Sequence, residues 1–586
     1  MTFPARDLVA AEALPSPLAM PDQDLRARFR DPAAPGLRRK GRVLAMRAAV
    51  LLLPMCVTAE LSRLSLGWFA LDGRLTLAEA ALVGITGFVF FWVVLSAVTA
   101  CLGLFWRPAS VLPTGRGLKV VILLPMYGEP AVETVDHAVQ LLAGLAAQGT
   151  HRFALRVLSD TRAPDAVARE QTAVAAARRR HPGLDIAWRH RTKNNDYKSG
   201  NIRDWVQSEG LAFDAMLILD ADSIMGRDTV LQMADALAGD PSLGLVQTVP
   251  RVLPGRTIWQ GLQSFASEIY GTNMGRGFAA WTGNEGNFLG HNAIVRICAF
   301  AACAGLPHLP GRAPRGGVIL SHDFVEAALL RRAGWGVRMM PEAADSFEDT
   351  PETLIGYLRR DRRWCQGNLQ HLRLLAVPGL HPLSRFHLLQ GAMAYLASVW
   401  WLALLILWSV PGQGGGTHDP FAANPLMPSW PVLPAFTQSA IAGFVLLMLV
   451  APKLLGLIAY LRDGRVPLAA TPRLAGLVLA EMVLSALLAP ALMVHQVRAV
   501  LRTAWGLDGG WMPHVTGASD LRTLVRFHAV ETGLGAALLA LMLAGHLSLW
   551  LAPVVIGLCL TVPLAAFVQM PRRRLGLRLL RRKPVT

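Results

Sequence analysis

The stretch Met216-Leu-Ile-Leu-Asp-Ala-Asp222 ends a short apolar run with two carboxylates that stand one residue apart. A continuous apolar run of this length is typical of a buried parallel strand. Ligands of such sheets bind beyond the carboxyl ends of the strands, where Asp220 and Asp222 can hold a divalent cation together with substrate phosphates. An aspartate in this place can equally cap the next helix, so the D-x-D motif alone leaves both interpretations open.

Strands and helices alternate around this stretch. Short apolar runs predict strands, and segments with helical periodicity predict helices between them. The expected strands cover residues 120–124, 153–158, 186–190, 215–219 and 243–249, and the expected helices cover 132–147, 164–180 and a segment from about 199. This order predicts an α/β domain over residues 118–373, with a parallel sheet covered by helices on both faces.

The composition excludes an ordinary soluble enzyme. Of the 586 residues, 53% are hydrophobic and only 17% are charged, whereas soluble domains carry about 25% charged residues. Apolar runs near the length of about 20 residues that a helical span requires cover residues 43–61, 80–105, 387–410, 436–461, 532–550 and 551–569. These six runs are the expected membrane spans. The six cysteines form no repeated C-x-x-C pair, so neither a zinc site nor a disulfide framework is indicated.

The distribution of lysine and arginine predicts the orientation. Basic residues precede the first span and follow the second: Arg38, Arg39, Lys40, Arg42, Arg107, Arg116 and Lys119. Because such residues flank spans on the cytoplasmic side, both termini and the α/β domain are expected inside, in a multi-pass protein of the bacterial inner membrane. The net charge of +17 is therefore interpreted as charge that flanks the spans and meets membrane lipids, and no nucleic-acid partner is expected.

One apolar run, residues 474–497, fits this orientation poorly. It contains Glu481, Pro490 and His495, and as a span it would leave the basic segments after it outside. We expect an interfacial or re-entrant helix on the cytoplasmic side, with seven or eight spans as the alternative to six. The chain is then divided into a basic, Pro-rich tail (1–42), two membrane helices (43–105), the α/β domain, a C-terminal membrane region (374–570) and a basic tail (571–586).

Further polar residues are expected at the edge of the sheet where D-x-D lies. Lys198 begins a helix, where a lysine and free amide groups suit a phosphate, although alone it can be a solvated lysine. Asp323, in Ser321-His-Asp323, can take a proton from an attacking hydroxyl. Arg363 can bind a diphosphate with two hydrogen bonds, and Trp364 can stack on a sugar. The alternative for the 359–363 run is a cationic helix face at the membrane surface.

These motifs together resemble a known family. Asp160, the D-x-D motif, Asp323 and Arg360-Asp-Arg-Arg363-Trp364, followed by the span from residue 387, resemble the processive family 2 glycosyltransferases, which include cellulose- and hyaluronan-synthase-like enzymes. Four longer segments are similar to the bacterial glucans biosynthesis glucosyltransferase H group: Pro125-Met-Tyr-Gly-Glu129, Gly286-Asn-Phe-Leu-Gly-His-Asn-Ala293, Ser321-His-Asp-Phe-Val-Glu-Ala-Ala-Leu329 and Arg360-Asp-Arg-Arg-Trp-Cys-Gln-Gly-Asn368.

The resemblance implies a GT-A nucleotide-diphospho-sugar transferase fold and the inverting transfer of glucose from UDP-glucose with Mg²⁺ or Mn²⁺. The product would be the β-1,2-linked backbone of osmoregulated periplasmic glucans, exported across the inner membrane. A periplasmic glucan-processing protein and an acyl carrier protein are implied partners. The alternative is another family 2 membrane glycosyltransferase, either a cellulose- or hyaluronan-like polysaccharide synthase or an enzyme that transfers a single sugar to a lipid acceptor. A transporter is disfavoured because the expected spans hold almost no charged residues.

The resemblance also implies residue roles. Tyr127, Glu129 and Asp160 would contact the nucleotide, Lys198 the diphosphate, and Asp220 and Asp222 the ribose–diphosphate and the metal. Asp323 would be the general base, while Arg360, Arg363 and Trp364 position the leaving group and the acceptor. The Gly290-His291-Asn292 segment would lie near the acceptor. His322 departs from the family pattern, which has Glu there. A segment over 506–526, with Trp511 and His514, would form a gating loop, or else a plain connector.

Overall fold

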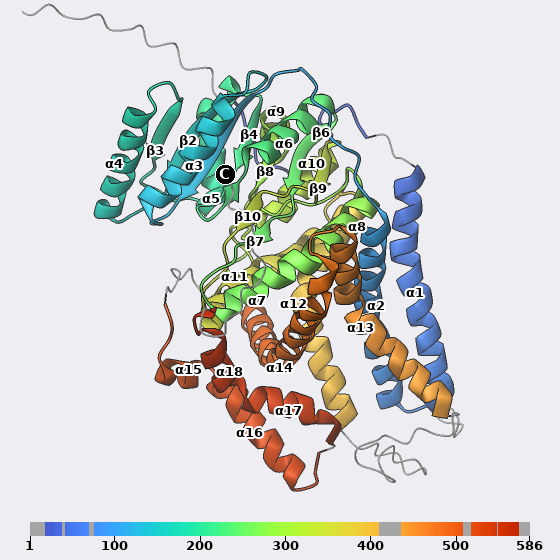
Figure 1. The fold of residues 1–586 in the computed structure, drawn as a ribbon. Helices are drawn as coiled ribbons and strands as arrows, with labels where there is room; N and C mark the ends of the chain where they lie inside the picture. The colour runs from blue at the N-terminus through green and yellow to red at the C-terminus, as the bar shows by residue number, and fades with distance from the viewer. Residues whose placement is uncertain are drawn as a thin grey trace, which may run out of the picture.

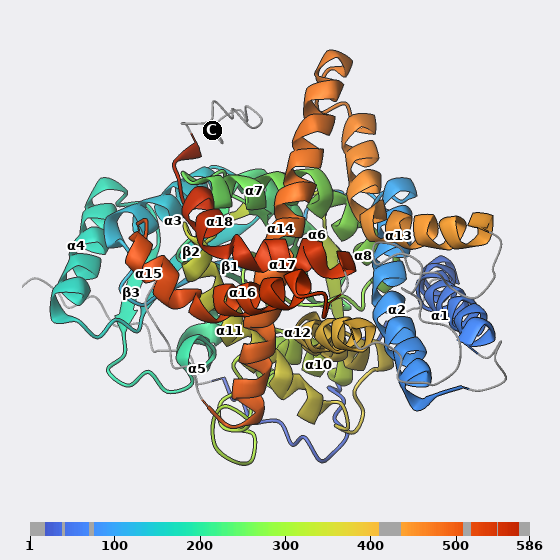
Figure 2. The same cartoon turned by 90° about the horizontal axis from the view of Figure 1, so that it is seen from below.

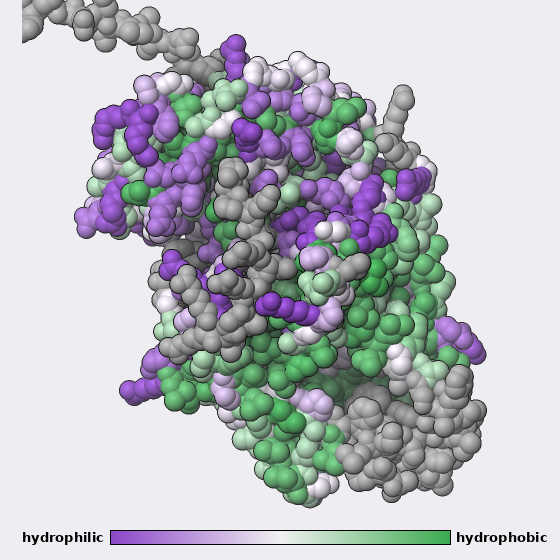
Figure 3. Space-filling view, viewed as in Figure 1, coloured by the Kyte–Doolittle hydropathy of each residue, from purple (hydrophilic) through white to green (hydrophobic). Residues whose placement is uncertain are grey.

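The computed structural model describes residues 18–37, 41–69, 75–409, 435–507, 517–547 and 549–572. An α/β domain lies at one end, and long helices extend from it (Figure 1). Hydrophilic residues cover the α/β domain, whereas hydrophobic residues cover the helices (Figure 3). This division of the surface agrees with a water-exposed domain attached to a membrane region.

The α/β domain contains a seven-stranded sheet in the order β3-β2-β1-β4-β8-β6-β9. Its strands are β1 (Lys119–Met126), β2 (Arg152–Ser159), β3 (Ile186–His190), β4 (Ala215–Ile218), β6 (Leu243–Thr248), β8 (Ala293–Arg296) and β9 (Gly336–Met340). The expected strands are all present, but the expectation of a wholly parallel sheet is wrong at β8, which runs antiparallel to both β4 and β6. The chain reaches β8 through helices that pack on the membrane region. It therefore enters the sheet at the end where the parallel strands finish, and β8 runs back against them.

Helices cover both faces of this sheet. One face is covered by α3 (Ala131–Ala146), α4 (Pro164–Arg180) and α6 (Arg227–Gly239). The other face is covered by α5 (Tyr197–Glu209), α9 (Ile297–Cys303) and α10 (His322–Ala333). A small second sheet, in the order β5-β10-β7, joins β5 (Ile224–Met225), β10 (Ser346–Glu348) and β7 (Arg251–Val252) beyond the end of β4.

Within the described residues, five helices are long and apolar enough to cross a membrane. They lie within α1 (Gly41–Phe69), α2 (Leu77–Phe105), α12 (Pro382–Ser409), α13 (Ala435–Arg462) and α14 (Thr471–Ala504). A sixth candidate is the pair α15 (Leu521–Phe527) and α16 (Ala529–Leu543), which is bent by 68°. These helices indicate a membrane protein.

The structure contradicts the last of the six expected membrane spans. Residues 551–569 do not form one helix but two, α17 (Ala552–Cys559) and α18 (Thr561–Val568), each of eight residues. At 1.5 Å per residue each is about 12 Å long, too short for a hydrocarbon layer of about 30 Å. The run over 474–497 lies in α14, whose 34 residues are long enough to span.

The direction of α14 nevertheless differs from that of α1. Figure 1 shows α1 upright below the α/β domain, whereas Figure 2 shows α14 along its length. An orientation across α1 is the one expected of an interfacial helix. The interfacial placement of α14 therefore stays a prediction.

Part of the expected N-terminal tail is bound to the α/β domain. Residues 18–37 lie on the α/β domain, and the Gln23 backbone N–H donates to the carbonyl of Gly305 at 3.0 Å. The indole N–H of buried Trp335 donates to Asp31 at 2.8 Å, and the guanidinium of buried Arg332 donates to Gln23 at 2.8 Å. Buried donors of this kind require acceptors, which explains why this polar segment is held in place.

A long helical segment connects the α/β domain to the membrane helices. It comprises α7 (Ile258–Ala266), a π-helical turn (Ser267–Gly271) and α8 (Thr272–Thr282). Glycines allow α8 to approach α2 closely: a Cβ on Gly277 would collide with the carbonyl oxygen of Thr99. The segment continues into residues 283–292, so this contact positions a loop of the candidate site.

We expect Gly277→Val to destabilise the protein by about 1–3 kcal/mol, because an inserted side chain must push α2 and α8 apart. The measurement is the unfolding midpoint of the protein in detergent. Gly84→Val is the matched control, since Gly84 also lies on α2 and a Cβ there meets nothing within 4 Å. Equal midpoints for the two variants would contradict the close packing of these helices.

Candidate active site

The D-x-D motif follows β4 and meets a lysine from α5. The side-chain ammonium of Lys198 donates to a carboxylate oxygen of Asp220 and, at 2.8 Å, to the carbonyl of Gly290. Burial acts to raise the pKa of Asp220, but the charges of Lys198 and His291 hold it below its ordinary value. Burial and the neighbouring Asp220 carboxylate raise the pKa of Asp222 to about 6. The two aspartates therefore differ in their affinity for protons.

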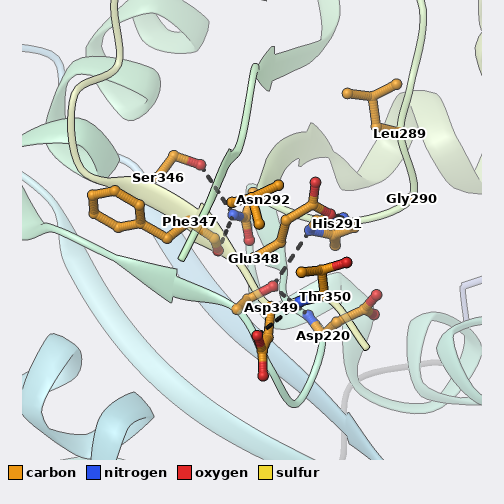
Figure 4. A network of polar contacts seen from close by, with 12 residues as sticks. Asp220, Leu289, Gly290, His291, Asn292, Ser346, Phe347, Glu348, Asp349 and Thr350 are labelled. Atoms are coloured by element: carbon orange, nitrogen blue, oxygen red, sulfur yellow. Dashed lines mark hydrogen bonds and ion pairs between the residues drawn. The ribbon is translucent and has the colours of Figure 1, made fainter. Parts of the chain in front are cut away.

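His291 lies beside the D-x-D motif (Figure 4). Its Nε2 is 3.2 Å from a carboxylate oxygen of Glu348, and its Nδ1 is 3.4 Å from the hydroxyl of Ser223. Although burial opposes the charged form, the carboxylates of Glu348 and Asp220 raise the pKa of His291 to about 9. The charged form of His291 is therefore favoured next to the aspartates, and its expected place near the acceptor stays a prediction.

Gly290 joins the D-x-D motif to Asp323. Its φ of +90° is a conformation that favours glycine, and a Cβ on it would lie 3.5 Å from Oδ2 of Asp323. Asp323 stands in the first turn of α10, and burial raises the pKa of its carboxyl. A raised pKa brings a carboxylate closer to the range in which a general base works best. The structure therefore brings Lys198, Asp220 and Asp323 together around one glycine.

Asn292 has a structural role in this arrangement. Its side-chain amide donates to the hydroxyl of Ser346 at 3.0 Å and to the carbonyl of Phe347 at 3.1 Å, as Figure 4 shows. These bonds join the end of the 283–292 loop to β10. Because Asn292 is fully buried, it positions Gly290 and His291.

The nucleotide side expected from the sequence lies at the ends of β1 and β2. Asp160 follows β2 and forms two hydrogen bonds with the guanidinium of Arg191, at 2.5 and 2.8 Å. Glu129 follows β1 and accepts a hydrogen bond from the backbone N–H of Tyr127 at 2.5 Å. Burial raises the pKa of Glu129, with a smaller contribution from Asp220. Glu129 and Asp220 are thus electrostatic neighbours, while the Asp160 carboxylate is neutralised by Arg191.

The basic motif lies on α11 (Leu354–Gln370). The guanidinium of Arg360 lies 4.5 Å from the ring centre of Trp364, a cation–π contact. Trp364 is 45% exposed, so part of this residue is accessible to a ligand. Burial and the neighbouring charges of Arg360 and Arg362 lower the pKa of Arg363.

A divalent cation fits the D-x-D motif. No group of three His, Cys, Asp or Glu side chains within the described ranges is arranged to hold a metal. Asp220 and Asp222 supply two carboxylates, and Mg²⁺ is commonly bound by one or two carboxylates plus substrate phosphates. The ammonium of Lys198 beside Asp220 shows that a positive charge is accommodated there.

Two partners of these residues, Glu348 and Arg191, are not among the residues predicted from the sequence. Glu348 ends β10, in the segment Ser346-Phe-Glu-Asp349, which is an apolar residue followed by an acidic pair. That signal resembles the end of β4 and could have been found. Arg191 follows β3 directly, but no spacing rule pairs an arginine with an aspartate 31 residues before it.

Of the expected gating loop, the structure describes residues 506–507 and 517–526. The backbone N–H of Gly517 donates to Glu352 at 2.9 Å, and Ser519 exchanges hydrogen bonds with Gln569. Glu352 lies two residues before α11, so this end of the segment contacts the start of the helix that carries the basic motif. Trp511 and His514 lie outside the described residues, as does the basic tail beyond Arg572.

Residues 215–452 match the family described as glycosyl transferase family group 2. Glucans biosynthesis glucosyltransferase H of Rhodopseudomonas palustris strain TIE-1 is 39% identical over 578 residues, which cover 95% of this chain and 79% of that protein. The protein of the same name from Vibrio cholerae O395 is 38% identical over 511 residues, or 84% of this chain and 71% of the relative.

Among solved structures, a mannosyltransferase from Pyrobaculum calidifontis in complex with GDP-mannose and Mn²⁺ is 17% identical. It covers 66% of this chain and 99% of its own length, with a TM-score of 0.40. The family match identifies the α/β domain as a GT-A-like glycosyltransferase domain, which confirms the expected fold. By its identity to relatives over most of their length, the chain belongs to the glucans biosynthesis glucosyltransferase H family of family 2 glycosyltransferases.

Proposed function

We propose that this glucosyltransferase polymerises glucose from UDP-glucose into a β-1,2-linked glucan and exports it across the inner membrane. The observation that carries the proposal is the convergence on Gly290, whose carbonyl accepts from Lys198 and whose Cα faces Asp323. A cationic group for a diphosphate and a carboxylate for an acceptor hydroxyl are thereby held at one point. These are the two groups that a single inverting displacement requires.

Asp323 acts as the general base in this proposal. Its carboxylate removes the proton of an acceptor hydroxyl, whose oxygen attacks the anomeric carbon as the bond to UDP breaks. No covalent enzyme intermediate forms, so one base is sufficient, unlike the paired carboxylates of retaining glycosidases. Burial raises the pKa of Asp323, which makes its carboxylate a stronger base than an exposed aspartate.

Cationic side chains neutralise the departing UDP. Lys198 and His291 lie beside Asp220, and Arg363 on α11 binds the diphosphate with two hydrogen bonds. Trp364 stacks on a sugar of the acceptor. Asp220 and Asp222 hold Mg²⁺ or Mn²⁺, which when bound stabilises charge on the leaving group.

The membrane region gives the product a path to the other side. In this proposal the GT-A domain and both termini are cytoplasmic, in agreement with the basic residues that flank the first two helices. The growing glucan is the acceptor. A periplasmic glucan-processing protein and an acyl carrier protein are proposed partners.

A donor panel tests the proposal. Purified protein in detergent is incubated with Mg²⁺ and, separately, radiolabelled UDP-glucose, UDP-N-acetylglucosamine or GDP-mannose. We expect label to enter product only from UDP-glucose. Preferred transfer from another donor, or none from UDP-glucose in protein that elutes as a single folded species, would contradict the proposal.

The segment 506–526 is proposed to close over the nucleotide. Closing loops exclude water and complete catalytic sites, so Trp511→Ala or His514→Ala should lower synthesis at least about tenfold without changing protein yield. Leu507→Ala, outside the Trp511–His514 stretch, is the control for a general effect on the segment. Near-normal synthesis by both the Trp511 and the His514 variant would identify the segment as a connector.

A further inference from the structure

His322 is a buried histidine that the mechanism above does not use. It is the first residue of α10 and precedes the proposed base. Its Nδ1 lies 3.1 Å from a carboxylate oxygen of Glu326, four residues on in the same helix. The side chains of His322 and Glu326 are only 14% and 4% exposed. The contact directs Nδ1 toward Glu326, so Nε2 is the nitrogen that can meet a ligand.

The surroundings of His322 favour its charged form. Burial opposes the charge, but the carboxylates of Glu326 and Asp323 hold the pKa of His322 above its ordinary value. The imidazole is also close enough to Asp220 to lower the pKa of that carboxyl. His322 therefore belongs to the electrostatic environment of the D-x-D motif as well as that of the base.

A second buried histidine, His371, shows that burial alone does not raise the pKa of an imidazole. The Nε2–H of His371 donates a hydrogen bond to the carbonyl of Ser321, 2.9 Å away, so His371 lies close to the start of α10. Burial lowers the pKa of His371 to about 4, and no carboxylate opposes the effect. His371 is a neutral packing residue, whereas Glu326 gives His322 a different role.

The charge balance of the site indicates what His322 meets. Four carboxylates gather there: Asp220, Asp222, Asp323 and Glu348. A diphosphate adds further negative charge and is repelled unless cations face it. Lys198 and His291 pair with Asp220 and Glu348, so a cation on the α10 side would add to the positive charge that these residues, Arg363 and the proposed metal present to the diphosphate.

We propose that His322 binds the diphosphate of the nucleotide sugar through Nε2 and that Glu326 holds the imidazole in place for this contact. The inference rests on the proposed function, because it assigns a residue to the donor of that reaction. His322 is then a binding residue, and Glu326 is a positioning residue. This assignment gives a role to the position at which the chain has His where the pattern of the processive family 2 glycosyltransferases has Glu.

Equilibrium binding of UDP and of uridine to the full-length protein in detergent, with Mg²⁺ present, separates a phosphate contact from a structural effect. We expect His322→Gln to weaken UDP binding about tenfold, the typical value for a lost hydrogen bond to a charged group. Uridine affinity, measured by competition, should stay within about twofold of wild type. Glu326→Gln should weaken UDP binding by a smaller factor and leave uridine binding unchanged.

His151→Gln is the matched control. His151 pairs with Asp235 at 3.4 Å and directly precedes β2, so it lies at the amino ends of the strands, whereas the candidate site lies at their carboxyl ends. It should leave both affinities unchanged. UDP binding by His322→Gln within twofold of wild type would overturn the inference, and an equal loss of UDP and uridine binding would show that His322 acts only on the fold. Wild-type protein that binds no UDP would overturn the proposed function itself.

Discussion

Asp323→Asn is expected to lower sugar transfer by about 10²–10⁴-fold, the usual contribution of a general base, while UDP still binds. Asparagine keeps the shape of the side chain but cannot accept the hydroxyl proton. The measurement is the rate of label transfer from UDP-glucose together with UDP affinity. Asp228→Asn is the control, because Asp228 is an exposed residue of α6 whose side chain is 70% exposed.

The pH dependence gives a second measure of the same residue. The active form is the carboxylate, so transfer should fall as the pH falls through the pKa of Asp323. Because burial raises that pKa, the loss should begin at a higher pH than for an ordinary aspartate. A variant that keeps more than about a tenth of wild-type transfer would show that Asp323 is not the base.

Removal of the metal is the other change with a large expected effect. Excess chelator should abolish transfer, and Mg²⁺ or Mn²⁺ should restore it, since a cation contributes several kcal/mol to the stabilisation of the leaving group. Asp222→Asn should lose transfer by about 10²-fold or more and should not be rescued at Mg²⁺ concentrations that saturate the wild type. Asp235→Asn, at the opposite edge of the sheet, is the control.

The outcome that would contradict this account is full transfer in excess chelator. In that case Lys198, which already pairs with Asp220, would be the main cation at the leaving group. Rescue of Asp222→Asn by ordinary Mg²⁺ concentrations would also remove Asp222 from the proposed metal site.

Local sequence patterns predicted most of the α/β domain because its strands are short, continuous and apolar. The runs behind β1, β2 and β4 are buried along almost their whole length, and burial produces the pattern that was recognised. The direction of β8 was not predictable in this way. Periodicity identifies a strand but not the edge from which the chain enters the sheet, which depends here on α7 and α8.

The membrane region was less predictable for a related reason. Hydropathy marks residues 551–569 as apolar, but it does not show that the helix breaks between Cys559 and Thr561. Likewise, a 34-residue apolar helix such as α14 can cross a membrane or lie along it. The distinction depends on packing against neighbouring helices, which a single sequence does not contain.

The candidate site followed from the rule that ligands bind where parallel strands end. Asp160, Asp220 and Glu129 each follow a strand of the parallel part of the sheet, and the structure places them at its edge. Their partners were not predicted, because Arg191 and Glu348 come from other strands and approach only in three dimensions. The charge state of His291 depends on Glu348, so it too required the structure.

The most direct test of the central claim is linkage and length analysis of the product that purified protein makes from radiolabelled UDP-glucose and Mg²⁺. We predict a water-soluble glucan of many glucose units joined by β-1,2 linkages. A glycolipid that bears a single sugar, or a glucan with another linkage, would contradict the proposed reaction.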